Sequence, residues 1–189
     1  LVLMLALCPL ITASDTVVNA IGLGLATIIA SVLVGATLSI LTRWLDDTMR
    51  IAATLLILAG ILALIERAML AWFYELRESL GVFLPLIVCN IALIRLWQQP
   101  LDAPRAIFDA LKLGASIALA LLLLGIAREL VGRGSLLHGA GHAFSAWFAP
   151  AELVVFDVDM GFLLAMLPPG AFISLGLLLA LRNWALRTK

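Results

Sequence analysis

Charged residues are scarce in this chain, and their scarcity excludes a soluble globular protein. Lys, Arg, Asp and Glu make up 13% of the 189 residues, whereas hydrophobic residues make up 64%. A soluble domain has about twice that charged share. The hydrophobic runs are continuous rather than alternating with polar residues, which favours helices over the strands of a β-barrel. The sequence therefore predicts an all-α integral membrane protein embedded in a lipid bilayer.

The chain has no net charge and few cysteines. The 12 basic residues balance the 12 acidic ones, so the chain has no excess of positive charge for binding nucleic acid, and no such partner is expected. Only two cysteines are present, Cys8 and Cys89. Because an iron–sulfur cluster takes four thiolates, this chain alone could supply at most half of a ligand set.

Six hydrophobic segments are expected to cross the membrane. They cover about residues 1–11, 17–41, 51–72, 80–94, 106–127 and 161–181, and a loop of about residues 128–160 precedes the last one. The first and fourth segments are shorter than the roughly 20 residues that a spanning helix needs. Each contains a proline, Pro9 or Pro85, and a proline interrupts a helix because it lacks an N–H and clashes with the preceding turn.

The basic residues predict how these segments are oriented. Six spans place both termini on one side of the membrane, together with eight Lys and Arg residues, and leave three on the other side. By the positive-inside rule, both termini are cytoplasmic and the 128–160 loop is extracytoplasmic. The sequence begins with Leu1 rather than Met, so we expect further residues to precede it.

An internal repeat divides the predicted spans. NAIGLGLAT (19–27) is similar to DALKLGASI (109–117), each stretch opens a long span, and each follows a short segment that carries a cysteine. The sequence thus predicts a single membrane domain of two three-span units, about residues 1–78 and 79–189. Because three is odd, the second unit is inverted across the membrane. In inverted-repeat proteins, interrupted helices form the functional site near the midplane.

Three interpretations of the two cysteines stay open. Each could be a small buried hydrophobic residue, the two could form a disulfide, or they could bind a metal or cluster at a subunit interface. A thiolate in lipid needs compensating hydrogen bonds. The interruptions at Pro9 and Pro85 would free backbone N–H groups for that purpose, and Asn90 adds an amide beside Cys89.

Other polar features carry weaker signals. Gly22 and Gly24 indicate close helix packing rather than phosphate binding. Glu66 and Arg67 lie in the third span, either as an interfacial pair or on an ion path. The stretch Arg128-Glu129, followed by two glycines, predicts the end of a helix. Four further residues are interpreted as loop residues: His138, His142, Asp157 and Asp159.

Five stretches resemble a known family. LALCPLI, TVVNAIGLGLAT, GVFLPLIVCN, LLGIARELVGRGSL and FLLAMLPPGAFISLGLLLA are similar, in this order, to the E-type subunits of Rnf electron-transport complexes. They are less similar to the related subunits of the sodium-translocating NADH:quinone reductase. The LLAMLPPGAF stretch resembles the E-type subunit rather than its A-type sister.

This resemblance implies a six-span subunit of the bacterial inner membrane. Such a subunit shares a 2Fe–2S cluster with its A-type sister subunit, and each contributes two cysteines. Their complex moves electrons between NADH and ferredoxin, coupled to Na⁺ or H⁺ transport, with the B-, C-, D- and G-type subunits as further partners. The chain would transfer electrons without catalysing a reaction, because it has no flavin-attachment motif or soluble nucleotide-binding domain.

The resemblance assigns the two cysteines unequally. Cys8, in LCPL, stands where the family has its first cluster ligand. The family's second cysteine directly follows the asparagine, where this chain has Ile91, and Cys89 lies two residues earlier. IRLWQQP also replaces the family's Gly-Arg-Ala-Glu run. Cys89 is still the expected second ligand. The alternative function is an inverted-repeat transporter of a small solute or ion, or a membrane scaffold, with structural cysteines.

Overall fold

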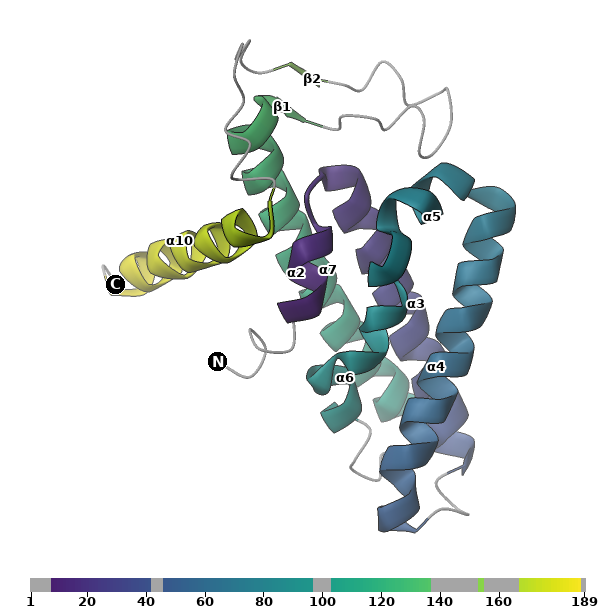
Figure 1. The fold of residues 1–189 in the computed structure, drawn as a ribbon. Coiled ribbons are helices and arrows are strands. Elements are labelled where there is room, and N and C mark those ends of the chain that lie inside the picture. The colour runs from purple at the N-terminus through teal and green to yellow at the C-terminus, as the bar shows by residue number, and fades with distance from the viewer. Residues whose placement is uncertain (1–7, 42–45, 97–102, 137–152, 155–166, 188–189) are drawn as a thin grey trace.

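The described residues form a bundle of helices with one very short strand pair. The computed structural model of this chain describes residues 8–41, 46–96, 103–136, 153–154 and 167–187 (Figure 1). Its long helices are α3 (Val17–Leu41), α4 (Asp47–Trp72), α7 (Ala103–Arg133) and α10 (Pro168–Arg187). The shorter elements are α2 (Cys8–Ala13), α5 (Tyr74–Leu80), η1 (Gly81–Phe83), η2 (Pro85–Cys89), α6 (Ile91–Leu96), β1 (Ser135–Leu136) and β2 (Leu153–Val154), of which η1 and η2 are 3₁₀ helices and β1 pairs antiparallel with β2.

Within the described residues, three helices are long and apolar enough to cross a membrane. They cover Val17–Leu41, Met49–Trp72 and Arg105–Arg133, and a shorter apolar helix covers Pro169–Ala180. These helices correspond to the second, third, fifth and sixth predicted segments. The helix of the fifth segment continues to Arg133, so it extends beyond the predicted start of the loop at residue 128. The membrane protein is therefore helical, while six spans in two inverted repeats stay a prediction.

The first and fourth predicted segments are short or broken. Within the described residues, the first contributes only the six-residue helix α2. In the fourth, α5 ends at Leu80, and the φ of 47° at the following Gly81 lies in the left-handed region that favours glycine. The chain continues as η1 and η2, passes through Asn90 in an extended conformation, and only then forms α6. The helix is thus interrupted on both sides of Pro85.

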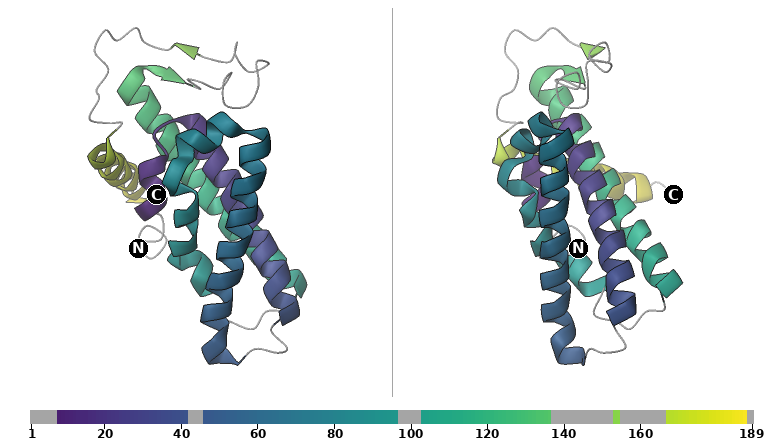
Figure 2. Two further views of the ribbon diagram at one scale, coloured as in Figure 1. Left: turned by 45° about the vertical axis from the view of Figure 1, so that its right-hand side comes forward. Right: turned by 90° about the vertical axis from the view of Figure 1, so that its right-hand side faces the viewer.

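Helices α3 and α7 lie side by side along much of their length, and small residues make this possible (Figure 2). A Cβ atom placed on Gly24 would lie 2.9 Å from the Cβ of Ala118, and one on Gly114 would lie 3.0 Å from the Cα of Ile28. The Ser31 hydroxyl also donates a hydrogen bond across the contact to the Ala110 carbonyl, at 3.2 Å. The predicted packing role of Gly24 is confirmed.

These contacts of Gly24 and Gly114 are related by the sequence repeat. In the alignment of 19–27 with 109–117, Gly114 takes the place of Gly24, and one turn later Ala118 takes the place of Ile28. Gly24 therefore meets the second-unit counterpart of the residue that Gly114 meets. Such reciprocal pairing is what a two-fold axis between two similar elements produces.

The contacts of the third helix in each unit also correspond between the two units. Helix α4 packs on α3 and η2, while α10 packs on α7 and α2. Helix α10 projects away from α3 and α4 (Figure 1), and its residues Phe172, Ile173, Leu177 and Trp184 are exposed. The interrupted segments α2 and η2 contact each other between these helices.

Filling the closest contact between α3 and α7 should destabilise the protein. Gly114→Leu would force its side chain against the backbone of Ile28 and the hydroxyl of Ser31, which a Cβ would already approach to 2.8 Å. Overpacking of this kind typically costs about 1–3 kcal/mol. We expect a lower temperature of heat-induced aggregation for the purified, detergent-solubilised complex. Gly60→Leu is the matched control, because nothing lies within 4 Å of a Cβ there. Equal aggregation temperatures for the two variants would contradict the packing described.

Candidate functional site

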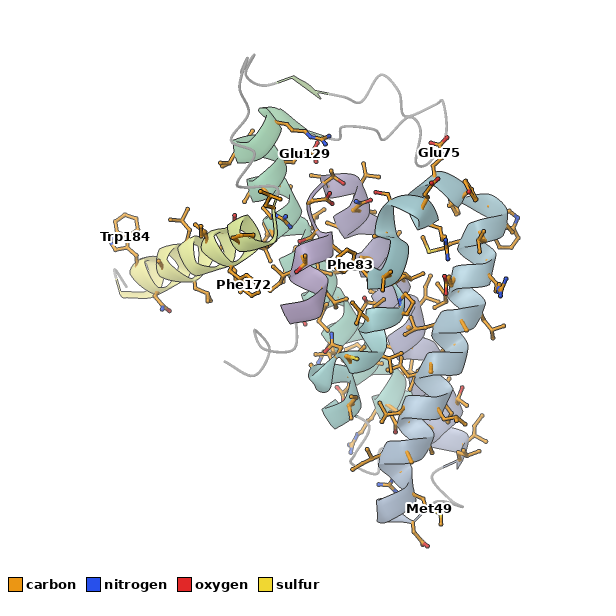
Figure 3. The ribbon with its side chains drawn as sticks, in the orientation of Figure 1. Met49, Glu75, Phe83, Glu129, Phe172 and Trp184 are labelled. Atoms are coloured by element: carbon orange, nitrogen blue, oxygen red, sulfur yellow. The ribbon has the colours of Figure 1, made fainter. Side chains whose placement is uncertain are left out.

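The contact between α2 and η2 brings together the two segments that carry the cysteines. Both segments turn large aliphatic side chains inward: Leu10 and Ile11 from α2, and Leu84 and Ile87 from the start and middle of the broken segment, are essentially inaccessible to solvent. Phe83 of η1 also lies next to α2 (Figure 3). The sequence interpretation paired these segments only through their prolines and cysteines, and the structure places them in contact.

The two cysteines occupy different positions in their segments. Cys89 is the last residue of η2, and its thiol is free and exposed at the surface of the chain. Cys8 is the first residue of α2, and its side chain lies outside the described part of the structure. The contact between α2 and η2 thus places the two backbones in one region. The exposure of Cys89 leaves its sulfur open to a group outside this chain.

Asn90 closes the 3₁₀ segment and opens α6. Its backbone N–H donates to the Ile87 carbonyl at 3.0 Å, and its side-chain Oδ1 accepts the Ala92 N–H at 3.0 Å. The residue is fully buried, and its Nδ2 has no hydrogen-bond partner among the described residues. Because the Ala92 N–H occupies Oδ1, the amide cannot flip to satisfy Nδ2. A buried donor is left for an acceptor that the described residues do not supply.

Two buried charges lie at the end of α7 nearest the turn between α2 and α3. The Arg128 Nη1 donates to the Ile11 carbonyl at 2.9 Å and to the Thr12 carbonyl at 3.4 Å. The Glu129 Oε2 accepts the Val17 N–H at 2.7 Å (Figure 3). Both side chains are fully buried. Sequence reasoning treated this pair only as a helix end. Two charges directly after a long apolar run were the signal that could have found their role.

The predicted glycine stop of this helix is confirmed. Helix α7 ends at Arg133, and Gly134 follows with a φ of 67° and donates its N–H to the Leu130 carbonyl at 3.1 Å. This is the geometry of a glycine that terminates a helix. The helix therefore carries Arg128 and Glu129 inside its last two turns rather than in the loop.

A second polar chain joins α3 to α5 at the same end of the bundle. The Asn19 Nδ2 donates to Asp15 Oδ1 at 2.8 Å, and the Ser79 hydroxyl donates to Asn19 Oδ1 at 2.9 Å. Asp15 also interacts electrostatically with Arg128. Sequence reasoning used Asn19 only to mark the repeat, because nothing in a single sequence pairs it with a serine 60 residues away.

Of the two ionisable residues in the third span, Glu66 has a partner on another helix. Glu66 pairs with Arg77 of α5 at 2.6 Å, with both side chains partly exposed, while Arg67 is exposed. The pair closes the corner between α4 and α5, as expected of an interfacial ion pair. His138, His142, Asp157 and Asp159 lie outside the described residues. Among those described, no three His, Cys, Asp or Glu side chains form a group that could hold a metal.

Comparison with known proteins places this chain in one family. Residues 1–179 match the family model described as "Rnf-Nqr subunit, membrane protein". The chain is 46% identical over 186 residues to the E subunit of the ion-translocating oxidoreductase complex of Thioalkalivibrio sulfidiphilus, covering 97% of this chain and 82% of that protein. It is 42% identical over 188 residues to the protein of the same name from Aliivibrio fischeri, and 40% identical over 186 residues to that of Vibrio parahaemolyticus.

Those two alignments also cover 97% of this chain, with 82% and 81% of the relatives. All three relatives are bacterial proteins that carry the name of one subunit of a larger complex. Both the family match and these identities extend over nearly the whole chain, including the segments of Cys8, Cys89 and the Arg128–Glu129 pair. The chain therefore belongs to the Rnf-Nqr family of membrane subunits, as the similarity of its motifs to the E-type subunits of Rnf complexes predicted.

Proposed function

We propose that this chain is the E-type subunit of an ion-translocating ferredoxin:NAD oxidoreductase complex, where it holds half of a 2Fe–2S cluster. The observation that carries the proposal is the contact between α2 and η2, the two short segments that begin and end, respectively, with a cysteine. The names of the relatives supply the complex. The cysteine arrangement supplies the part this chain plays in it, which is electron transfer rather than catalysis.

The residues present fit half of such a cluster. Two thiolates from this chain leave two to be supplied by another subunit. The exposed thiol of Cys89 is accessible to a cluster that such a subunit shares. The Nδ2 of buried Asn90 has no partner among the described residues, and it could donate a hydrogen bond to a cluster sulfur. When bound, the cluster supplies one-electron transfer. The chain's own part is to hold two sulfurs and to exclude water with Leu10, Leu84 and their neighbours.

The displacement of Cys89 from the family's position does not exclude it as a ligand. On a continuous α-helix a shift of two residues rotates a side chain by about 200° and would point it the opposite way. Here Cys89 ends a 3₁₀ segment and Asn90 is extended, with a ψ of 103°. Because the helix is interrupted between positions 89 and 91, the helical rotation does not apply there.

The reciprocal contacts of Gly24 and Gly114 support the inverted repeat. In that arrangement α2 and η2 enter the membrane from opposite faces and meet near its middle. Both termini then lie in the bacterial cytoplasm. The partner that completes the ligand set is the A-type sister subunit, while electron passage is coupled to Na⁺ or H⁺ movement by the whole complex.

A transporter is the second candidate. Its support is the same unpartnered Asn90 donor, because an interrupted helix with unused hydrogen-bonding groups is also how inverted-repeat transporters bind a solute. Iron distinguishes the two functions: a solute site needs none, whereas electron transfer through Cys8 requires it.

Replacing Cys8 should abolish the cluster. We expect the complex purified with Cys8→Ala to lose the EPR signal that this chain contributes on reduction, together with the corresponding iron, because an alanine cannot ligate. Ser14→Ala is the control, since that hydroxyl donates to the Ile11 carbonyl at the end of the same segment and carries no sulfur. Retention of the full signal in Cys8→Ala, with the protein still present in the complex, would refute the proposal.

Cys89 needs its own experiment, because the family's cysteine stands at position 91. We expect Cys89→Ser to lose the signal and Cys89→Ser combined with Ile91→Cys to regain it, since the double variant restores a thiol on the same stretch. If Cys89→Ser leaves the EPR spectrum unchanged, Cys89 is not a ligand and another subunit provides a third one.

A further inference from the structure

Arg128 and Glu129 are adjacent, fully buried and oppositely charged within a membrane-spanning helix. A charge in such a place is expensive unless hydrogen bonds compensate it, and it usually has a function. Neither the relatives' names nor the proposed cysteine ligands give these two residues a role. Their contacts indicate a role, because Arg128 binds the end of one helix and Glu129 binds the start of another.

The pair joins the end of α2 to the start of α3. Adjacent side chains on a helix point about 100° apart, so Arg128 reaches the carbonyls of Ile11 and Thr12 while Glu129 reaches the N–H of Val17. The last carbonyls of a helix and the first N–H groups of the next have no partners within their own helices. A cation at the first and an anion at the second also complement the helix dipoles.

Helix α2 depends on such outside contacts because it is short. Its six residues make fewer than two turns, whereas an isolated helix needs about 12–15 residues to be even marginally stable in water. Its position is therefore set by the packing of Leu10 and Ile11 and by the guanidinium that holds its final carbonyls.

The sequence repeat does not require this pair. In the alignment that relates Gly24 to Gly114, the places of Arg128 and Glu129 in the first unit are taken by Leu38 and Ser39. Leu38 is buried in the core, and the Ser39 hydroxyl donates to the Ala36 carbonyl of its own helix. The buried charges thus serve the half of the chain that contains Cys8 and have no charged counterpart at those two positions.

We propose that Arg128 and Glu129 are positioning residues that fix α2 and thereby place the sulfur of Cys8. The inference rests on the proposed function for the identity of what Cys8 binds, but the anchoring of α2 can be measured without any cluster. Arg128 acts on Cys8 through the carbonyl end of α2, and Glu129 fixes the chain where α3 begins. Together they hold the turn between the two helices from both sides.

The test compares Arg128→Met, Arg128→Lys and Glu129→Gln with Arg133→Met in the assembled complex. Arg133 lies farther along α7 and is exposed, so its variant controls for loss of an arginine from this helix. In a Cys89→Ser background, Cys8 is the single cysteine of these 189 residues. Cys89→Ser is expected to abolish the cluster and so leave the Cys8 thiol unligated. The rate at which N-ethylmaleimide labels Cys8 of this chain in membrane vesicles then reports the position of α2.

We expect Arg128→Met to label at least about tenfold faster than Arg133→Met, because it loses the hydrogen bonds that a charged group donates to the Ile11 and Thr12 carbonyls. Arg128→Lys keeps the charge but not the fork of donors and should lie between them. Glu129→Gln keeps an acceptor for the Val17 N–H and should change the rate less than Arg128→Met. Equal rates for all four variants would overturn the anchoring. If Arg128→Met does not assemble, Arg128→Lys decides in the same way.

The second measurement keeps both cysteines and follows the EPR g-values and midpoint potential of the reduced cluster. Arg128→Lys should shift them, whereas Arg133→Met should not, and this separates positioning from a general loss of stability. Faster labelling with unchanged g-values and potential would overturn the link from α2 to the cluster. A parent complex without any such signal would refute the proposed function, while the labelling rates would still decide the anchoring of α2.

Discussion

The close approach of α3 and α7 is the constraint on which the rest of the structure depends. Backbones come this near only where side chains are very small, because in lipid there is no hydrophobic effect to drive helices together and packing must do so. Gly24 and Gly114 provide the space, and each meets the other helix at a repeat-related position. With these two helices fixed at the centre, α4 packs on α3 and α10 packs on α7. The interrupted segments α2 and η2 contact each other between them.

From this arrangement the polar groups acquire their roles. An interrupted helix in a bilayer exposes backbone groups that water cannot satisfy, so side chains must do so. Arg128 satisfies carbonyls at the end of α2, Glu129 an N–H at the start of α3, and Asn90 an N–H at the start of α6. These three buried side chains thus lie where helices begin or end. The same interruptions bring two cysteine-bearing backbones into one region, the arrangement from which we propose shared ligation of a cluster.

The sequence predicted the parts of the fold that depend on continuous patterns. The length of α3 matches its predicted range because a continuous apolar run ends in polar residues at both sides, and the role of Gly24 followed from its small size. The contact between α2 and η2 could be inferred only indirectly, from two prolines at similar places. The partners of Glu66, Asn19 and Arg128 could not be predicted, because a single sequence records which residues are polar but not which helix end they will face. For α7, the apolar run stops before the helix does, since buried charges continue it to Arg133.

The unsatisfied amide of Asn90 has a consequence for how the complex is made. Its Nδ2 is buried and has no acceptor within the described part of the chain, which raises the free energy of the lone chain by about 1–3 kcal/mol. Any group that supplies the acceptor in the mature assembly binds only the folded chain and therefore shifts its equilibrium away from unfolding. A copy that never receives that group opens more often, and cellular proteases remove chains in proportion to how often they open. One side chain can in this way couple the lifetime of the protein to the completeness of its assembly.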